Sequence, residues 1–86
     1  MQHRVAVIGI IIENKSSVDA LNHIISEYSD YVIGRMGIPY RERGISIICL
    51  SVDAPQDIIS GLSGKIGRLD GISAKTAYSN TVFEED

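Results

Sequence analysis

Two segments of the chain, residues 5–12 and 45–52, are apolar on both faces that a β-strand would present. Each is rich in β-branched residues and too short for a stand-alone helix, so each predicts a buried strand. The first segment carries Val5, Val7 and Ile11 on one face and Ala6, Ile8, Ile10 and Ile12 on the other. The second carries Ile45, Ile47 and Cys49 against Ile48, Leu50 and Val52. The fold must therefore cover both sides of these strands.

Two amphipathic helices are expected between and after these strands. The first helix follows the polar residues 13–16, with Ser16 or Ser17 as its cap and Asp19 in its first turn. The second helix starts at Asp53-Ala54-Pro55, because Asp can cap free amides and Pro fits the first helical position. The apolar stripes that predict them are Val18, Leu21, Ile24, Ile25 and Tyr28 in the first, and Ile58, Ile59, Leu62, Ile66 and Leu69 in the second.

Two further strands are expected at residues 31–36 and 72–79, and a connection over residues 37–44 with glycine and proline predicts an antiparallel hairpin. The order strand, helix, strand, strand, helix, strand is that of the ferredoxin-like βαββαβ fold. We therefore predict an α+β protein with a four-stranded antiparallel sheet and two helices on one face. A single domain is expected over residues 1–80, followed by an acidic tail at residues 81–86 that frays.

Composition narrows the function classes. With 86 residues, 44% of them hydrophobic and 22% charged, the chain suits one globular domain. A net charge of −3 argues against direct nucleic-acid binding through phosphate neutralisation. The longest apolar run, residues 5–12, is far shorter than the roughly 20 residues that cross a bilayer, so no membrane association is expected. One Cys and no Lys/Arg-led apolar leader predict a cytoplasmic protein.

The second apolar face of the sheet predicts self-association. If both helices cover one face, the other face leaves an apolar patch of several hundred Å² on a lone subunit, a size typical of interaction surfaces. We therefore expect a homo-oligomer, a dimer or a tetramer, that forms through the open sheet face.

No catalytic or metal-binding set is visible in the sequence. His3 and His23 lie in no nucleophile or metalloprotease motif, and Cys49 is typical of a small core residue. No His-x-His or Cys-x-x-Cys spacing joins them into a metal site. The stretch Gly61-Leu62-Ser63-Gly64-Lys65 does not meet the phosphate-loop pattern. We predict that the chain is not an enzyme and holds no metal or cofactor, although a small effector remains open.

Six residues in or beside two loops are candidates for effector or partner binding. Arg35, Arg41 and Arg43 place three guanidinium groups in or beside the hairpin, where they can grip a carboxylate, a phosphate or an acidic surface, and Tyr40 adds an apolar ridge. A solvated hairpin, its charge partly offset by Glu42, is the competing interpretation. Asn14 and Ser16 stand where the first strand meets a helix N-terminus, and ordinary capping also explains them.

The stretches NHIISEY at residues 22–28 and IGRMGIPYR at residues 33–41 resemble a family of small stand-alone regulators of the iron-only hydrogenase system. The resemblance covers nearly the whole chain, and GRMGIPY is its most specific part. It implies an ACT-like domain related to the effector domain of the nickel-responsive repressor. The repressor's histidine and cysteine ligands are matched only by Cys49, so nickel sensing is not implied. The loop at residues 13–17 likewise lacks the Gly or Pro favoured by amino-acid-binding ACT domains.

Two functions follow from this resemblance. The first is an oligomeric, ligand-sensing regulator of the hydrogenase system, without a DNA-binding segment of its own, whose effector contacts Asn14, Ser16, Arg41 and Arg43. The alternative is a protein-interaction or assembly factor for the hydrogenase or its maturases, with Tyr40, Arg41 and Arg43 as the partner surface.

Overall fold

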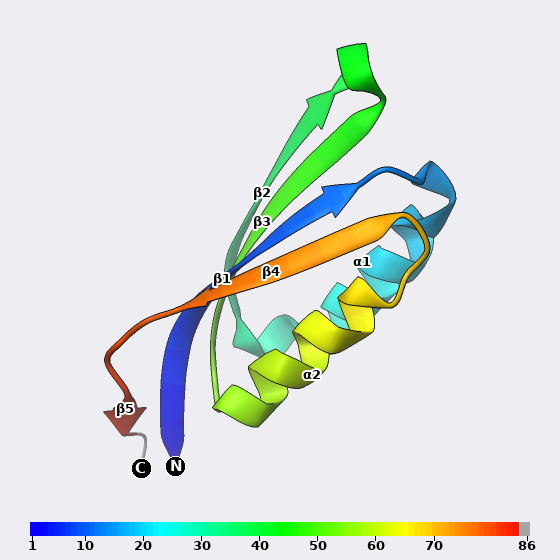
Figure 1. Cartoon of the computed structure of the whole chain (residues 1–86). Helices are drawn as coiled ribbons and strands as arrows, with labels where there is room; N and C mark the ends of the chain where they lie inside the picture. Colours follow the sequence, from blue (N-terminus) through cyan, green and yellow to red (C-terminus); the bar gives the residue numbers. More distant parts are fainter. Residues whose placement is uncertain (85–86) are drawn as a thin grey trace.

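The computed structural model describes residues 1–84 and confirms the predicted α+β architecture, with both helices on one side of an antiparallel sheet (Figure 1). The helices are α1 (Val18–Glu27) and α2 (Gln56–Gly67). The strands are β1 (Gln2–Ile12), β2 (Val32–Tyr40), β3 (Ile45–Ala54), β4 (Ile72–Tyr78) and the short β5 (Phe83–Glu84). Short 3₁₀ turns form at Lys15–Ser17, Ser29–Tyr31 and Arg41–Arg43.

The sheet order is β2-β3-β1-β4, which is the ferredoxin-like order, and β5 adds to β1 outside this path. The central strand β1 pairs with β3 from Arg4↔Ala54 to Ile12↔Ser46 and with β4 from Ala6↔Tyr78 to Ile12↔Ile72. The edge strand β2 pairs with β3 from Tyr40↔Ile45, with a bulge between Val32 and Gly34. The β2–β3 hairpin therefore extends beyond the end of β1, as Figure 1 shows.

The hydrophobic core lies between the sheet and the two helices. Both apolar stripes of the helices face it, with Leu21, Ile25, Ile59, Leu62 and Ile66 buried. The sheet contributes every second residue of its strands, as a β-strand's alternation requires: Ala6, Ile8, Ile10 and Ile12 from β1, Ile48, Leu50, Val52 and Ala54 from β3, and Ile72 from β4.

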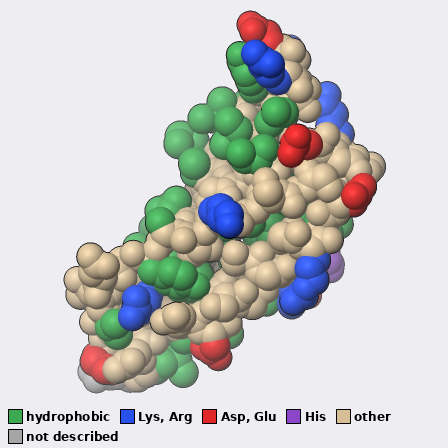
Figure 2. All heavy atoms as spheres, in the orientation of Figure 1, with side chains coloured by type: hydrophobic (Ala, Val, Ile, Leu, Met, Phe, Trp, Pro, Cys, Tyr) green, Lys and Arg blue, Asp and Glu red, His purple; other side chains and the backbone are tan. Residues whose placement is uncertain are grey.

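The opposite face of the sheet is also apolar along β1, as the sequence predicted, and neither α1 nor α2 covers it. The register places Val7 of β1 beside Ser51 of β3, and Ile11 beside Ile47. Val7 is 43% exposed and Ile11 is 42% exposed. The β2 side chains Met36, Ile38 and Tyr40 extend the same surface. Figure 2 shows hydrophobic side chains gathered beside the β2–β3 hairpin on the side away from the helices.

Two predicted boundaries are wrong. The hairpin connection is not residues 37–44, because β2 continues to Tyr40 and only the turn Arg41–Arg43 and Gly44 join the strands. Pro39 is tolerated there because β2 is an edge strand. Asp53 does not cap α2, because β3 continues to Ala54 and Pro55 is the residue before the helix.

Up to Glu84, the C-terminal end of the chain is paired with β1 and is not a simple tail. Phe83 and Glu84 pair with His3 and Gln2 of β1, and the N-terminal ammonium lies 3.9 Å from the Glu84 carboxylate. Residues 85–86 lie outside the described residues, so the predicted fraying of residues 81–86 stays a prediction.

Candidate functional site

The loop between β1 and α1 uses its polar groups to hold the fold together. The Asn14 side-chain oxygen accepts hydrogen bonds from the Ser16 backbone N–H at 3.0 Å and from the Ser16 hydroxyl at 2.7 Å. The Asn14 amide donates to the Asp70 carboxylate at 2.8 Å, and the Ser17 hydroxyl donates to the Asp70 carbonyl at 2.7 Å. Two of the predicted effector residues, Asn14 and Ser16, thus serve as a cap that ties this loop to the α2–β4 loop.

The hairpin tip carries three of the predicted site residues on the surface. Tyr40, Arg41 and Arg43 are exposed, and the Tyr40 hydroxyl donates to the Glu42 carboxylate at 3.4 Å. Gly44 closes the turn in the left-handed conformation, with φ at 65°. Figure 2 shows both acidic and basic side chains at this tip. The tip therefore presents charge beyond the sheet, away from the Asn14 loop's hydrogen bonds.

Arg35 lies apart from the tip, on the helix-covered face of β2. Its neighbour across the sheet is Leu50 of the core, and its guanidinium donates to the Asn22 side-chain oxygen of α1 at 2.7 Å. A groove of about 280 Å³ runs along α1 and β2 on one side of this contact, with Arg35 and Asn22 among its lining residues. A second groove of about 310 Å³ lies between the hairpin and the start of α1, and Arg35 lines it as well. Arg35 is the residue that the two grooves share.

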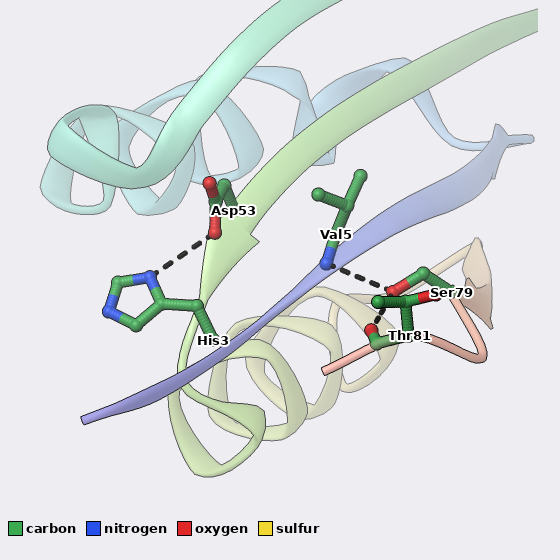
Figure 3. Close-up of polar contacts among 5 residues, drawn as sticks. All are labelled: His3, Val5, Asp53, Ser79 and Thr81. Carbon is green, nitrogen blue, oxygen red and sulfur yellow. Dashed lines mark hydrogen bonds and ion pairs between the residues drawn. The ribbon is translucent and has the colours of Figure 1, made fainter. Parts of the chain in front are cut away.

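The other end of the sheet holds a contact that joins β1 to β3 (Figure 3). His3 Nδ1 lies 3.2 Å from the Asp53 carboxylate, and the register places Asp53 opposite Val5. On the other side of β1, the Ser79 hydroxyl contacts the Val5 N–H at 3.3 Å and donates to the Thr81 carbonyl at 2.7 Å. These contacts anchor the C-terminal segment on β1 and place a carboxylate at the end of the open sheet face.

Within residues 1–84, no three His, Cys, Asp or Glu side chains gather as metal ligands. The helices of this part of the chain, at 10 and 12 residues, are too short to span a membrane. A side-chain hydrogen bond to Tyr28 raises the pKa of Lys65, whose Nζ lies 5.0 Å from the centre of the Tyr28 ring.

Comparison with known proteins agrees with this fold. The family of TM1266-like iron-only hydrogenase system regulators matches residues 4–76. The chain belongs to this family. The uncharacterized protein TM1266 from Thermotoga maritima is 28% identical, with a TM-score of 0.85 over 88% of this chain and 96% of that one.

A second solved structure resembles this chain in fold alone. A formyltetrahydrofolate deformylase from Pseudomonas putida KT2440 is 17% identical, with a TM-score of 0.64. The match covers 90% of this chain but only 29% of the deformylase. No curated protein matches the chain.

Two partners in these contacts were not among the sequence candidates: Asn22, which holds Arg35, and Asp70, which holds Asn14. Both belong to contacts between residues at least 13 positions apart in the chain. The resemblance motifs offered one signal, since Asn22 opens the first motif and Arg35 lies in the second. Sequence reasoning treated Arg35 as part of the hairpin charge, whereas the structure joins it to α1.

Proposed function

We propose that this member of the family regulates the iron-only hydrogenase system by binding a small anionic effector beside Arg35. The family description supports the regulatory role. The Arg35–Asn22 contact between two grooves is the observation that carries the effector site. In this proposal the protein acts in the cytoplasm and passes the signal to another protein.

The chemistry of the groove supports an anion with a short apolar part. A guanidinium has five N–H donors in a planar fork, and the hydrogen bond to Asn22 at 2.7 Å orients that fork while others remain for a carboxylate or phosphate. Ser26 and Ser29 add hydroxyl groups at the groove, and Ile25 and Val32 supply apolar surface. The volumes of about 280 and 310 Å³ are at the small end of ligand pockets, which are typically about 300 Å³ or larger.

The position of the groove also suits regulation. Its walls come from two separate elements, α1 and β2, so an anion that contacts both joins the helix layer to the edge of the sheet. A ligand that binds only the folded form raises its stability by mass action. The expected signal is therefore a stiffer α1–β2 edge and a higher unfolding temperature.

The test is a thermal-shift screen of the whole chain against small carboxylates, phosphate and phosphate esters. We expect at least one anion to raise the unfolding temperature of the natural protein and to lose this effect in Arg35→Gln. Arg43→Gln is the matched control, because it removes the same charge at the hairpin tip and leaves the groove unchanged. The proposal is wrong if no anion stabilises the protein or if Arg35→Gln retains the full shift.

Asn14 and Ser16, the loop contacts predicted from the sequence, enter the same screen. Their polar atoms already bond within the loop and to Asp70, so we expect Ser16→Ala to retain the anion shift. Loss of the shift in Ser16→Ala with a normal shift in Arg35→Gln would move the effector site to the β1–α1 loop.

The overhanging hairpin favours a second candidate function, the assembly or interaction factor. Ile12 at the end of β1 pairs with Ser46, so Tyr40, Ile45 and the turn that joins them project beyond β1. A ridge that combines an aromatic ring with two arginines has the residue types that dominate protein interfaces. Co-purification of a hydrogenase subunit or a maturase should be lost in the triple variant Tyr40→Ala, Arg41→Ala, Arg43→Ala and retained in Arg35→Gln. Retention in the triple variant would contradict this function.

A further inference from the structure

The centre of the open sheet face contains a glycine that the subunit itself does not require. Gly9 lies in the middle of β1, between Cys49 of β3 and Lys75 of β4. A Cβ added at Gly9 would meet nothing closer than the Lys75 carbonyl oxygen at 3.8 Å, an ordinary van der Waals distance, and the Gly9 backbone does not have a positive φ. Glycine within a strand often marks a place where another backbone or a ligand approaches closely.

The missing side chain leaves a hollow in an apolar surface. This hollow has a volume of about 260 Å³, and Ile11, Ile47 and Lys75 line it together with Gly9. The exposed side chains of Val7, Met36 and Ile38 continue the apolar surface around it. An apolar surface with a backbone-lined depression at its centre fits a close approach of a second sheet.

The two ends of this face differ in charge. At the hairpin tip, Arg41 and Arg43 flank the single carboxylate of Glu42. At the other end, the Asp53 carboxylate lies on this face, in register with Val5 and 3.2 Å from His3 Nδ1. A second copy of this chain that is turned end to end places its basic tip near Asp53 of the first copy.

From these observations we infer that two copies of the chain pack their open sheet faces together, with strands antiparallel and a two-fold axis across the strands at Gly9 and Cys49. The inference does not depend on the effector site at Arg35. In this arrangement Gly9 lies over Gly9 of the other copy, which lets the two β1 strands approach. The same register places Lys75 across from Lys75 of the other copy, and because β4 is an edge strand both ammonium groups can extend past the rim of the interface into water. Val7 of one copy then packs against Ile11 of the other, and each hairpin tip lies toward Asp53 of the other copy.

The size of the face agrees with a stable dimer. Strand β3 has 10 residues, and four strands about 4.8 Å apart with about 3.3 Å per residue give a face of roughly 600 Å² before side-chain relief is counted. A standard interface buries about 800 Å² on each partner, and a face of this size approaches that area once side-chain relief is counted. Aligned sheets pack with their strands about 30° apart, which the twist of each sheet accommodates.

Sedimentation velocity of the full chain gives the first test. We expect a dimer at micromolar concentration and a dissociation that becomes easier at high salt, because the charged ends contribute. A protein that remains monomeric up to about 1 mM, an affinity too weak for a specific dimer, overturns the inference.

A matched pair of glycine variants tests the position of the interface. Gly9→Ala adds one methyl group to the centre of the open face, and Gly37→Ala adds the same group on β2 in register with the core residue Ile48, where it meets nothing within 4 Å. We expect Gly9→Ala to weaken the dimer at least tenfold, with an unchanged circular dichroism spectrum, and Gly37→Ala to retain its affinity. Equal affinities for both variants overturn the inference. Val7→Ser, at a surface side chain, repeats the test if Gly9→Ala fails to fold.

The orientation is tested by charge exchange and by cross-linking at Cys49, the only cysteine in the chain. The double variant Arg41→Glu, Arg43→Glu should not pair with itself but should form a heterodimer with Asp53→Arg. A short bismaleimide should join Cys49 to Cys49 in the natural dimer, since both lie on the axis. A dimer that neither cross-links at Cys49 nor responds to the charge exchange contradicts the antiparallel arrangement.

The outcomes separate this inference from the effector proposal. A monomer that binds an anion at Arg35 overturns only the dimer, and a cross-linked dimer without an anion shift overturns only the effector site.

Discussion

The two faces of strand β1 are both apolar in sequence but differ in environment. On the face that α1 and α2 cover, Ile8 and Ile10 are completely buried, whereas Val7 and Ile11 on the opposite face are 43% and 42% exposed. Alternation along a strand tells which residues share a face, but it does not tell what covers that face. Both helices lie on one side because βαβ-type crossovers have one favoured hand. The open face therefore exposes apolar side chains that no other part of the described chain covers.

The largest effect that tests this comparison is expected when a buried side chain on the covered face is truncated. Ile10→Ala should lower the free energy of unfolding by roughly 2–5 kcal/mol, because the side chain is fully buried and its removal leaves a cavity. Urea denaturation followed by circular dichroism measures the change.

The matched control is Ile11→Ala on the open face of the same strand. In dilute solution, where the subunit is separate, it should cost only about 0.5 kcal/mol. Equal losses for both variants would show that the two faces are equally buried and would contradict the comparison.

The next largest effect is expected where a loop holds a helix on the covered face. Gly71 has φ at 69°, and a Cβ there would collide with Asn14 Cβ and lie 3.0 Å from the Asn14 backbone nitrogen. Gly71→Ala should therefore lower the free energy of unfolding by more than about 2 kcal/mol, since strain adds to the collision.

Gly44 in the hairpin turn provides the comparison. Its φ is 65°, but nothing lies within 4 Å of an added Cβ, so Gly44→Ala should cost about 1 kcal/mol from backbone strain alone. Thermal unfolding of both variants checks the ranking. If Gly44→Ala is the more damaging variant, then the β1–α1 and α2–β4 loops do not hold the covered face together.

Much of the fold was predictable because its signals are local. The apolar stripes of the helices and the alternation of β1 and β3 follow from residue periodicity, and the element order then selects the ferredoxin-like topology. The boundaries that failed depend on pairing between distant residues. The local sequence predicts Asp53 to be a helix cap. Pairing with β1 instead extends β3 to Ala54 and places Asp53 beside His3.

Loss of the Asn14 cap should have a moderate effect. Asn14→Ala removes the hydrogen bonds from Ser16 and the bond to Asp70, and it should cost about 1 kcal/mol, as for other helix caps. Hydrogen exchange should show faster opening at the start of α1 and little change in the hairpin. Unchanged exchange at α1 would mean that other contacts, such as Ser17 to Asp70, fix this end of the covered face.

The candidate site was predictable only in part. The sequence singled out Arg35 for its charge and its place in a specific motif, yet its partner Asn22 and the grooves around it come from the packing of α1 against β2. Arg41 and Arg43 are where the sequence placed them, at an exposed turn. Their proposed use in self-association depends on Asp53 at the far end of the face, which local sequence predicted as a helix cap and the β1–β3 register places on the open face.

The smallest effect is expected on the outer surface of the helices, where Lys65 of α2 meets Tyr28 at the end of α1. The hydrogen bond from the Lys65 ammonium to Tyr28, and then the charge of the Tyr28 phenolate, raise the pKa of Lys65 above 10.5. The folded pKa of Lys65 exceeds its unfolded value. Whatever small stability this contact adds is therefore fully present below pH 10.5 and is lost as the pH rises through the raised pKa. Tyr28→Phe should return the pKa of Lys65 toward its ordinary value in an NMR titration. Lys65→Met should leave the unfolding midpoint at neutral pH unchanged, because the ammonium is fully solvated. A large loss in Lys65→Met would mean that this surface contact, and not only the buried face beneath it, holds α1 and α2 together.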